Sequence, residues 1–202
     1  LLFVVHREEI LKQSLRTFRS VLGDANFGEL WVGNCHPEDS MSNLFVSVDT
    51  LNNNIDVFRN LGFDYYDYII IDCGLKHELL TINALAAADY CIIPVQAHFL
   101  ASEGIPDVLE MVKNVKNRFN PDLKIAGILL TMYQSRPQLC HSVRNSVNDI
   151  YGESLHVFER PIEQTIKVAE CPAAVMSILD YAPKNPAAES YRSLALEVLH
   201  LA

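Results

Sequence analysis

The sequence lacks the loop with which many nucleotide-binding domains hold phosphates. Its 202 residues contain no G-x-x-x-x-G-K-[ST] pattern and no Gly-Lys dipeptide. In that pattern, backbone N–H groups cradle the phosphates and the lysine reaches the terminal ones. Any nucleotide chemistry of this chain must therefore be argued from other residues.

Three other features that the sequence lacks exclude classes of protein. No apolar run approaches the roughly 20 residues that span a membrane, so we expect no membrane segment. The five cysteines never form a C-x-x-C pair, which argues against a zinc site or a disulfide framework and favours a reducing cytoplasm. The formal net charge of -9 argues against a chain that is basic overall, although a local basic patch can still bind nucleic acid.

The sequence does contain a regular alternation of short apolar runs and amphipathic stretches. The short runs predict strands over 1–5, 44–48, 68–72, 90–95, 125–132 and 155–158. The helical spacing of apolar residues predicts helices over 10–22, 79–88, 105–119, 139–150 and 185–201. Alternating strands and helices predict an α/β fold, a mainly parallel sheet flanked by helices. From the length we expect one domain over residues 1–202.

One apolar run ends in an acid. Tyr68 is followed by three isoleucines and then by Asp72. Ligands of parallel α/β sheets bind beyond the carboxyl ends of the strands, so Asp72 is predicted at such a rim. There it would hold Mg²⁺, which needs few protein ligands because phosphates and water complete its shell. The alternative is that Asp72 caps the following helix or loop.

Six segments follow one another in a characteristic order between about residue 66 and the C-terminus. They are Tyr66-Asp67-Tyr68-Ile69-Ile70-Ile71-Asp72-Cys73, Leu79-Leu80-Thr81-Ile82-Asn83-Ala84-Leu85, Ile93-Pro94-Val95-Gln96, Gly127-Ile128-Leu129-Leu130-Thr131-Met132-Tyr133, Val168-Ala169-Glu170-Cys171-Pro172 and Asn185-Pro186-Ala187-Ala188-Glu189-Ser190-Tyr191. Over residues 66–202 the chain resembles the ParA/MinD group of partition ATPases, above all the Soj-like ParA proteins.

This resemblance implies ATP and Mg²⁺ as cofactors and a set of site residues. Asp72 would manage the metal and so be the catalytic carboxylate. Gln96, Thr131 and Met132 would lie near the nucleotide, and Pro161 near its base. The alternative for these last four residues is ordinary packing at the ends of strands.

The resemblance also implies partners. Members of the group dimerise with ATP on DNA, without sequence preference, and a ParB-like partner stimulates hydrolysis. The candidates here for contacts to DNA phosphates are Arg136, Arg144 and Lys167. A solvated surface is the alternative for such basic residues. The implied location is cytoplasmic, with no membrane partner.

The first 65 residues carry a different resemblance. The two segments concerned are Leu2-Phe3-Val4-Val5-His6-Arg7-Glu8-Glu9-Ile10-Leu11 and Leu44-Phe45-Val46-Ser47-Val48-Asp49-Thr50-Leu51. They resemble the first RecA-like lobe of superfamily-two helicases of the restriction-enzyme type, and the likeness extends to residue 72. The two resemblances meet over about 63–72, on a strand that both families share. A chimera of two P-loop NTPases is therefore one hypothesis for the origin of the chain.

Departures from both families bear on activity. Cys73 stands where a helicase has the glutamate that activates water. Gly74-Leu75-Lys76 stands where a partition ATPase usually has Pro-Pro-Ser, and Lys76 is either a phosphate contact or a surface lysine. The first strand, P-loop and helix of the partition fold are expected before Leu1. Without that loop, most of the phosphate affinity and transition-state stabilisation is lost.

Three functions remain open from the sequence. The first is a ParA-type partition ATPase domain for DNA segregation, weakly active or inactive as given. The second is a non-enzymatic scaffold, chimeric or truncated. The third is a fragment of a helicase lobe that contacts nucleic acid through Arg7 and Thr50.

Overall fold

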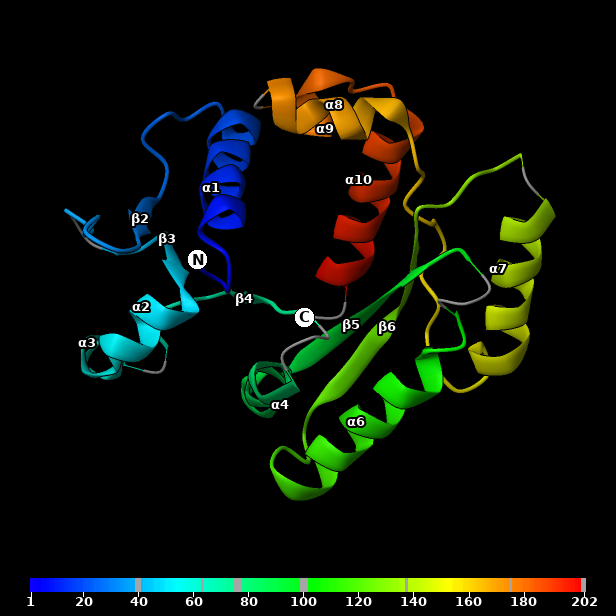
Figure 1. Cartoon of the computed structure of the whole chain (residues 1–202), viewed down its shortest axis with the longest axis horizontal. Helices are drawn as coiled ribbons and strands as arrows, with labels where there is room; N and C mark the ends of the chain where they lie inside the picture. The colour runs from blue at the N-terminus through cyan, green and yellow to red at the C-terminus, as the bar shows by residue number, and fades with distance from the viewer. Residues whose placement is uncertain are drawn as a thin grey trace. The chain divides into compact units, whose positions relative to one another are not determined.

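The structure is a computed structural model, and it describes residues 1–38, 41–62, 64–74, 78–98, 102–136, 138–174 and 176–200 (Figure 1). The chain divides into two compact units. The first consists of Leu1–His77 with Glu170–Tyr181, and the second of Glu78–Ala169 with Ala182–Ala202. Each unit is described separately.

The first unit contains a four-stranded parallel sheet in the order β2-β3-β1-β4. Its strands are β1 (Leu2–Val5), β2 (Glu29–Trp31), β3 (Leu44–Ser47) and β4 (Ile69–Asp72). Its helices are α1 (Glu8–Leu22), α2 (Val48–Asn53) and α3 (Ile55–Leu61). The strands β1, β3 and β4 and the helix α1 match the predictions, whereas β2, α2 and α3 were not predicted.

The core of the first unit has two layers, one on each face of its sheet, because successive side chains of a strand point to opposite faces. One layer joins Leu2 and Val4 to partly buried side chains of α2 and α3, among them Leu51 and Phe58. The other layer places Val5 and its neighbours against the buried face of α1, with Phe45, Leu11 and Leu15. Helices therefore cover both faces of this sheet.

Strand β4 is the edge strand of the first unit's sheet. It pairs with β1 in parallel, and Ile69 and Ile70 are 54% and 43% exposed. A run of three isoleucines is typical of a strand buried on both faces. The structure thus confirms the strand but places it at the edge of this sheet, where less of its surface is covered.

The segment Glu170–Tyr181 lies far from α1 in the sequence but belongs to the first unit. It contains the end of α8 (Ile166–Ala174) and the short helix α9 (Ile178–Tyr181). Ser20 of α1 donates a hydrogen bond to Asp180 Oδ2 at 3.0 Å, and Ser177 donates to the same oxygen at 3.0 Å. A carboxylate from the partition-like part of the chain thus anchors the helix of the restriction-type part.

The second unit is built on two parallel strands, β5 (Tyr90–Gln96) and β6 (Lys124–Thr131). Its helices are α4 (Glu78–Ala87), α6 (Ile105–Arg118), α7 (Gln138–Tyr151) and α10 (Pro186–Leu199). All four correspond to predicted helices. Asn185 caps α10, because its side chain accepts the N–H of Ala187 at 3.0 Å and Pro186 occupies the first turn.

Helices cover both faces of the second unit's strands (Figure 1). On one face, Ile128 and Leu130 of β6 pack with Ile105 of α6 and with Val143 and Val147 of α7. On the other face, a cluster joins β6 to α10 and consists of Ala126, Leu129, Phe158, Ile162, Leu194 and Val198. The predicted α/β class, a parallel sheet flanked by helices, is therefore confirmed.

The strand predicted over 155–158 is not formed as a regular strand. Val157 makes an isolated parallel bridge with Ile128, and a second bridge joins Tyr133 to Glu163. The intervening Pro161 has no N–H to donate, so the ladder cannot continue through it. The segment 156–164 nevertheless follows β6 to its carboxyl end.

Candidate functional site

Three of the predicted nucleotide residues lie at the carboxyl end of the second unit's strands. Gln96 and Thr131 are register partners at the last position of the β5–β6 pair. Ala97 then donates its N–H to Thr131 O at 2.9 Å, which keeps the two chains together beyond the strands. Met132 follows directly on β6. This is the end of a parallel sheet at which α/β proteins bind ligands.

The fourth residue, Pro161, is brought to the same end by the segment 156–164. Ile162 donates its N–H to Leu130 O at 2.8 Å, and Tyr133 donates to Ile162 O at 3.0 Å. Ile162 therefore lies alongside Thr131 and Met132, and the buried Pro161 immediately precedes it. The structure thus gathers Gln96, Thr131, Met132 and Pro161, which are spread over the sequence, at one rim.

Met132 has an unusual backbone conformation for a residue with a side chain. Its φ is 51°, in the left-handed region, and 46% of its surface is exposed. A non-glycine residue in this region costs on the order of 1 kcal/mol and is typical of sites where the chain must turn sharply. The turn directs the chain away from β6 towards α7 and leaves Met132 open at the rim.

Polar side chains behind the rim connect its parts. Tyr133 is buried, and its hydroxyl lies 2.9 Å from His141 Nδ1 on α7. His141 Nε2 lies 2.8 Å from Ser135 O. Because a carbonyl oxygen only accepts, Nε2 must donate to Ser135 O. The ring thereby links Tyr133 to the backbone of Ser135.

Two more contacts tie the rim together. Cys140 Sγ on α7 donates to Ala97 O at 3.5 Å, and Gln134 Nε2 donates to Gln164 Oε1. None of these residues, nor His141, is predicted from the sequence to have a role at the rim. Nothing in their spacing indicates the contacts, because each pair comes together only when α7 and segment 156–164 pack beside β6.

Asp72 lies at the end of β4 in the first unit. It is the register partner of Val5 in a parallel pair, so it stands at the carboxyl rim of that sheet. Its side chain is exposed and makes no hydrogen bond or ion pair within the described part of the chain. A single exposed carboxylate fits Mg²⁺, which draws most of its ligands from phosphate and water. Among the described residues no group of three or more His, Cys, Asp or Glu could hold a metal ion.

Lys76, the predicted alternative phosphate contact, lies outside the described residues. The residues predicted for DNA contacts have different surroundings. Arg136 is exposed and has no hydrogen-bond or ion-pair partner within the described ranges. Arg144 donates Nη2 to Glu159 O at 2.9 Å, which uses part of its donor set. Lys167 is exposed on α8. Of the two arginines, Arg136 has no part of its guanidinium bound by the described residues, whereas Arg144 has.

The residues of the helicase hypothesis lie in the first unit. Arg7 is exposed at the start of α1. Thr50 Oγ1 accepts a hydrogen bond from Ser47 Oγ at 2.8 Å, and Ser47 also accepts the Thr50 N–H as the N-cap of α2. Thr50 therefore takes part in a local helix cap.

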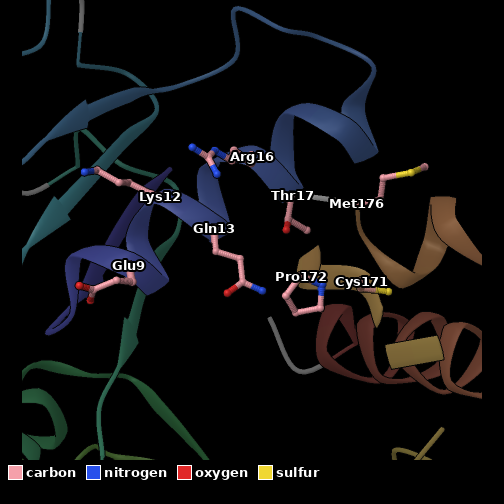
Figure 2. A pocket seen from close by; sticks show the side chains of 8 residues that line it. All are labelled: Glu9, Lys12, Gln13, Arg16, Thr17, Cys171, Pro172 and Met176. Atoms are coloured by element: carbon pink, nitrogen blue, oxygen red, sulfur yellow. The ribbon is translucent and has the colours of Figure 1, made fainter. Parts of the chain in front are cut away.

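A hollow also lies in the first unit. Its volume is about 300 Å³, and it is lined by side chains of α1 and by Cys171, Pro172 and Met176. Figure 2 shows Gln13 and Thr17 near Pro172 and Met176, while Lys12 and Arg16 extend away from Pro172. The hollow contains none of the predicted site residues.

Two family models match the chain. The model described as an AAA domain matches residues 38–125, and the model described as the res subunit of type III restriction enzymes matches residues 1–74. The two matches overlap over 38–74, which contains the predicted meeting point of the two resemblances. The mixed resemblance predicted from the sequence is thus confirmed.

The parallel sheets, their covering helices and the residues at their carboxyl rims define the class of P-loop-NTPase-like α/β proteins. A solved cobyrinic acid a,c-diamide synthase from Mycobacterium smegmatis, with bound ADP and magnesium, shares this fold with a TM-score of 0.60 and 26% identity. The match covers 96% of this chain and 80% of that one.

Relatives among known proteins narrow the class further. The chromosome-partitioning ATPase Soj of Thermus thermophilus is 34% identical over 179 residues, which cover 85% of this chain and 71% of that protein. The chromosome partitioning protein ParA of Myxococcus xanthus is 41% identical over 144 residues, 71% of this chain and 50% of that protein. The chain therefore belongs to the ParA/Soj family of partition proteins. It spans about half the length of the first relatives it matches, including the Myxococcus protein.

Proposed function

We propose that this chain forms the nucleotide-site portion of a ParA-type partition ATPase. The observation that carries the proposal is the gathering of Gln96, Thr131, Met132 and Pro161 at one carboxyl rim of the second unit. Membership of the ParA/Soj family supports ATP as the nucleotide. Separately, Asp72 of the first unit is proposed as a ligand of Mg²⁺.

The chain has residues suited to the base and to the metal of MgATP but lacks the loop that holds the phosphates. The Thr131 and Gln96 side chains offer polar contacts at the rim, and Pro161, which is buried beside them, is proposed to lie under the base. The Asp72 carboxylate suits Mg²⁺. However, these 202 residues contain no glycine-rich loop and lysine to hold the phosphates. We therefore propose weak nucleotide binding and little or no hydrolysis for the chain as given.

Isothermal titration calorimetry and a ¹⁵N NMR titration with MgATP and MgADP test the proposal. We expect weak binding, with shifts of the Thr131, Met132 and Ile162 amides. Thr131→Val should weaken binding, because it removes the hydroxyl and keeps the shape. Thr17→Val, on α1, is the matched control. Tight MgATP binding that is lost in Asp72→Ala, or clear ATP turnover, would show that the chain is more active than proposed.

DNA, a second copy of the chain and a ParB-like activator are the partners proposed for the whole protein. For DNA, the observation on this chain is the free guanidinium of Arg136. Filter binding across salt concentrations should show retention at low salt only, because the contacts are to phosphates. Arg136→Ala should reduce that retention more than Arg192→Ala, because Arg192 already donates to Pro183 O at 2.8 Å. Equal retention of the two variants would contradict the proposed contact.

The proposed location is the cytoplasm. None of the five cysteines is in a disulfide, which is compatible with a reducing compartment. Within the described ranges, no helix has the length and apolar character needed to cross a membrane.

The missing phosphate loop favours one alternative, a scaffold without enzymatic activity. The same titrations separate the two functions. A chain that binds neither MgATP nor MgADP at millimolar concentration is a scaffold, whereas weak binding with shifts confined to the rim supports the nucleotide site.

A further inference from the structure

The segment that carries Pro161 leaves the β6 ladder just before that residue. Phe158 donates its N–H to Ile128 O at 3.0 Å, and the next backbone bond to β6 is made by Ile162 at 2.8 Å. Between these two bonds the chain passes through Glu159 and Arg160. A backbone N–H or C=O group that leaves the β6 ladder needs another hydrogen-bond partner, because burying such a group without one costs free energy.

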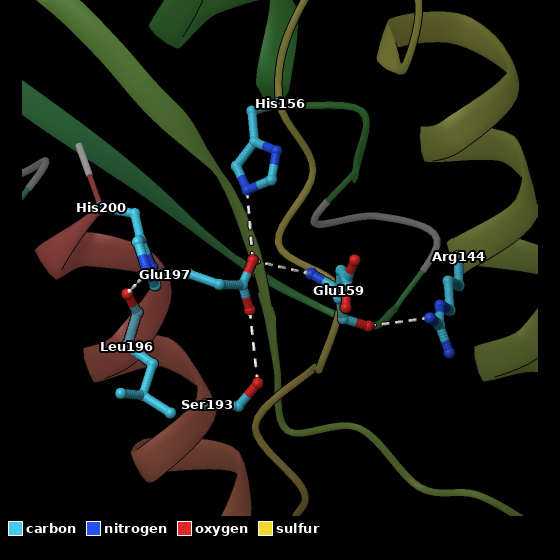
Figure 3. Close-up of polar contacts among 7 residues, drawn as sticks. All are labelled: Arg144, His156, Glu159, Ser193, Leu196, Glu197 and His200. Atoms are coloured by element: carbon cyan, nitrogen blue, oxygen red, sulfur yellow. Dashed lines mark hydrogen bonds and ion pairs between the residues drawn. The ribbon is translucent and has the colours of Figure 1, made fainter.

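Side chains from two helices supply these partners for Glu159. Arg144 of α7 donates Nη2 to Glu159 O at 2.9 Å. Glu197 of α10 accepts the Glu159 N–H on Oε2 at 3.2 Å. Figure 3 shows the two side chains reaching the same residue from different elements. Both backbone groups of Glu159 are thus held two residues before Pro161.

Glu197 makes further contacts that fix its carboxylate. His156 Nε2 lies 3.2 Å from Oε2, and Ser193 Oγ donates to Oε1 at 3.4 Å. The Glu197 side chain is only 21% exposed, against 46% for His156. Hydrogen bonds to a partly shielded carboxylate are stronger than those between neutral groups. Glu197 therefore joins both ends of the turn 156–159 to α10.

The start of the turn is fixed by close packing. The His156 and Phe158 rings are 4.9 Å apart, edge to face. They lie over Gly127 of β6, where an added Cβ would come within 2.9 Å of His156 O and of the Phe158 ring. At the other end, Arg160 Nη2 donates to Glu189 Oε2 on α10 at 2.7 Å. The path of the chain into Pro161 thus depends on α7 and α10 as well as on β6.

We propose that Glu197, assisted by Arg144, is a positioning residue of the nucleotide rim. Its carboxylate fixes the position of the turn 156–159 relative to β6. It thereby fixes the position of Pro161 beside Thr131 and Met132. The inference rests on the proposed nucleotide function and extends it to a side chain of α10.

The test combines two measurements on Glu197→Ala, Glu197→Gln, Arg144→Ala and the control Glu110→Ala. Glu110 is an exposed carboxylate on α6 with no side-chain hydrogen bond or ion pair in the described part of the chain. The first measurement is the MgADP dissociation constant from a ¹⁵N titration. The second is amide hydrogen exchange at Glu159 and Ile162, which reports the turn without any nucleotide.

We expect Glu197→Ala to weaken MgADP binding by about tenfold, the loss typical of a hydrogen bond to a charged group. Exchange at Glu159 and Ile162 should quicken, while exchange in α6 stays unchanged. Glu197→Gln keeps an acceptor and should recover most of the affinity. Arg144→Ala should act in the same direction, and Glu110→Ala should match the wild type.

Two adverse outcomes are distinguishable. If wild-type protein binds no MgADP, the proposed function fails and the positioning role fails with it. If the wild type binds but Glu197→Ala binds equally well, or Glu197→Gln is no better than Glu197→Ala, the positioning role alone is overturned. A variant that unfolds is recognised by fast exchange throughout α6, and Arg144→Ala then decides the question.

Discussion

At the scale of single residues, the first unit depends on a close approach at Gly28. Its φ is 69°, and an added Cβ would lie 3.0 Å from both Leu15 and the Phe45 ring. Arg19 fixes the same turn by donating Nε to Phe27 O at 2.7 Å and Nη2 to Gly28 O at 2.8 Å. This turn places the Phe27 ring in contact with the rings of Phe18 and Phe45, which also contact each other.

Gly28→Ala should therefore destabilise the protein by about 2 to 3 kcal/mol, from the left-handed backbone and the clash together. Gly33→Ala is the matched control. Its φ is 55°, but nothing lies within 4 Å of an added Cβ, so only the backbone cost of about 1 kcal/mol applies. Urea unfolding of both variants checks the difference, and equal losses would contradict the role of close packing.

Tyr66 is expected to make the free energy of unfolding depend on pH in the alkaline range. Burial, together with the nearby Tyr65 and Glu29, raises the pKa of Tyr66 from 10.0 to about 12. Its hydroxyl donates to Met41 O at 2.9 Å. The raised pKa means that the neutral phenol is favoured in the folded state, so its contribution is complete below pH 10.

As the pH rises from 10 towards 12, the unfolded chain ionises first and the free energy of unfolding should fall. Tyr66→Phe should be less stable than the wild type at pH 9 and should lose part of this fall. Urea unfolding between pH 9 and 11.5 measures both effects. Tyr151→Phe, in the second unit, should keep the wild-type dependence; an identical dependence in Tyr66→Phe would contradict the assignment.

At the scale of elements, the signals at helix ends were accurate and the strand signals were less so. Gly23 ends α1 in the left-handed conformation, and Asn185-Pro186 begins α10, at the expected ends of the helices predicted over 10–22 and 185–201. These signals are local, so they survive whatever packs against the helix. The predicted strand over 155–158 failed because its partner is reached only in part, on either side of Pro161. The short helices α2 and α3 have too few turns to show a clear period.

Asn185→Ala should cost about 1 kcal/mol, because the N–H of Ala187 loses its acceptor. The same side chain also accepts from Thr165 Oγ1 at 3.2 Å, so segment 156–165 should loosen as well. Asn145→Ala, on the exposed face of α7, should be neutral or slightly stabilising through helix propensity. Thermal unfolding of the two variants checks this, and similar midpoints would contradict the capping role.

At the scale of the whole molecule, the division into units does not follow the order of the sequence. The first unit takes Glu170–Tyr181 from the partition-like part and packs α9 against α1. The prediction of one domain over 1–202 stays a prediction, as does the chimeric origin. What the structure adds is that residues from both resemblances are needed to complete one unit.

Asp180→Ala should destabilise the first unit by about 1 kcal/mol, because it removes the acceptor of both Ser20 and Ser177. Hydrogen exchange should show the loss in α1 and leave α6 of the second unit unaffected. Asp149→Ala, an exposed carboxylate on α7, is the control. Equal exchange in α1 for the two variants would mean that the segment adds nothing to the unit.

The class of fold and most of the helices follow from the sequence alone, because periodicity and family motifs are local features of the chain. Asp72 likewise needs only the strand before it to be placed at a carboxyl end. The assignment of Gln96, Thr131, Met132 and Pro161 to a nucleotide site stays a prediction. The tertiary structure alone decides that Glu197 and Arg144 hold Glu159, that His141 is bound to Tyr133, and that residues 170–181 complete the first unit. Most of these partners are far apart in sequence, and even the near pair Tyr133 and His141 meets only through packing of α7 beside β6. Such contacts arise from the packing of whole elements, which no local pattern encodes.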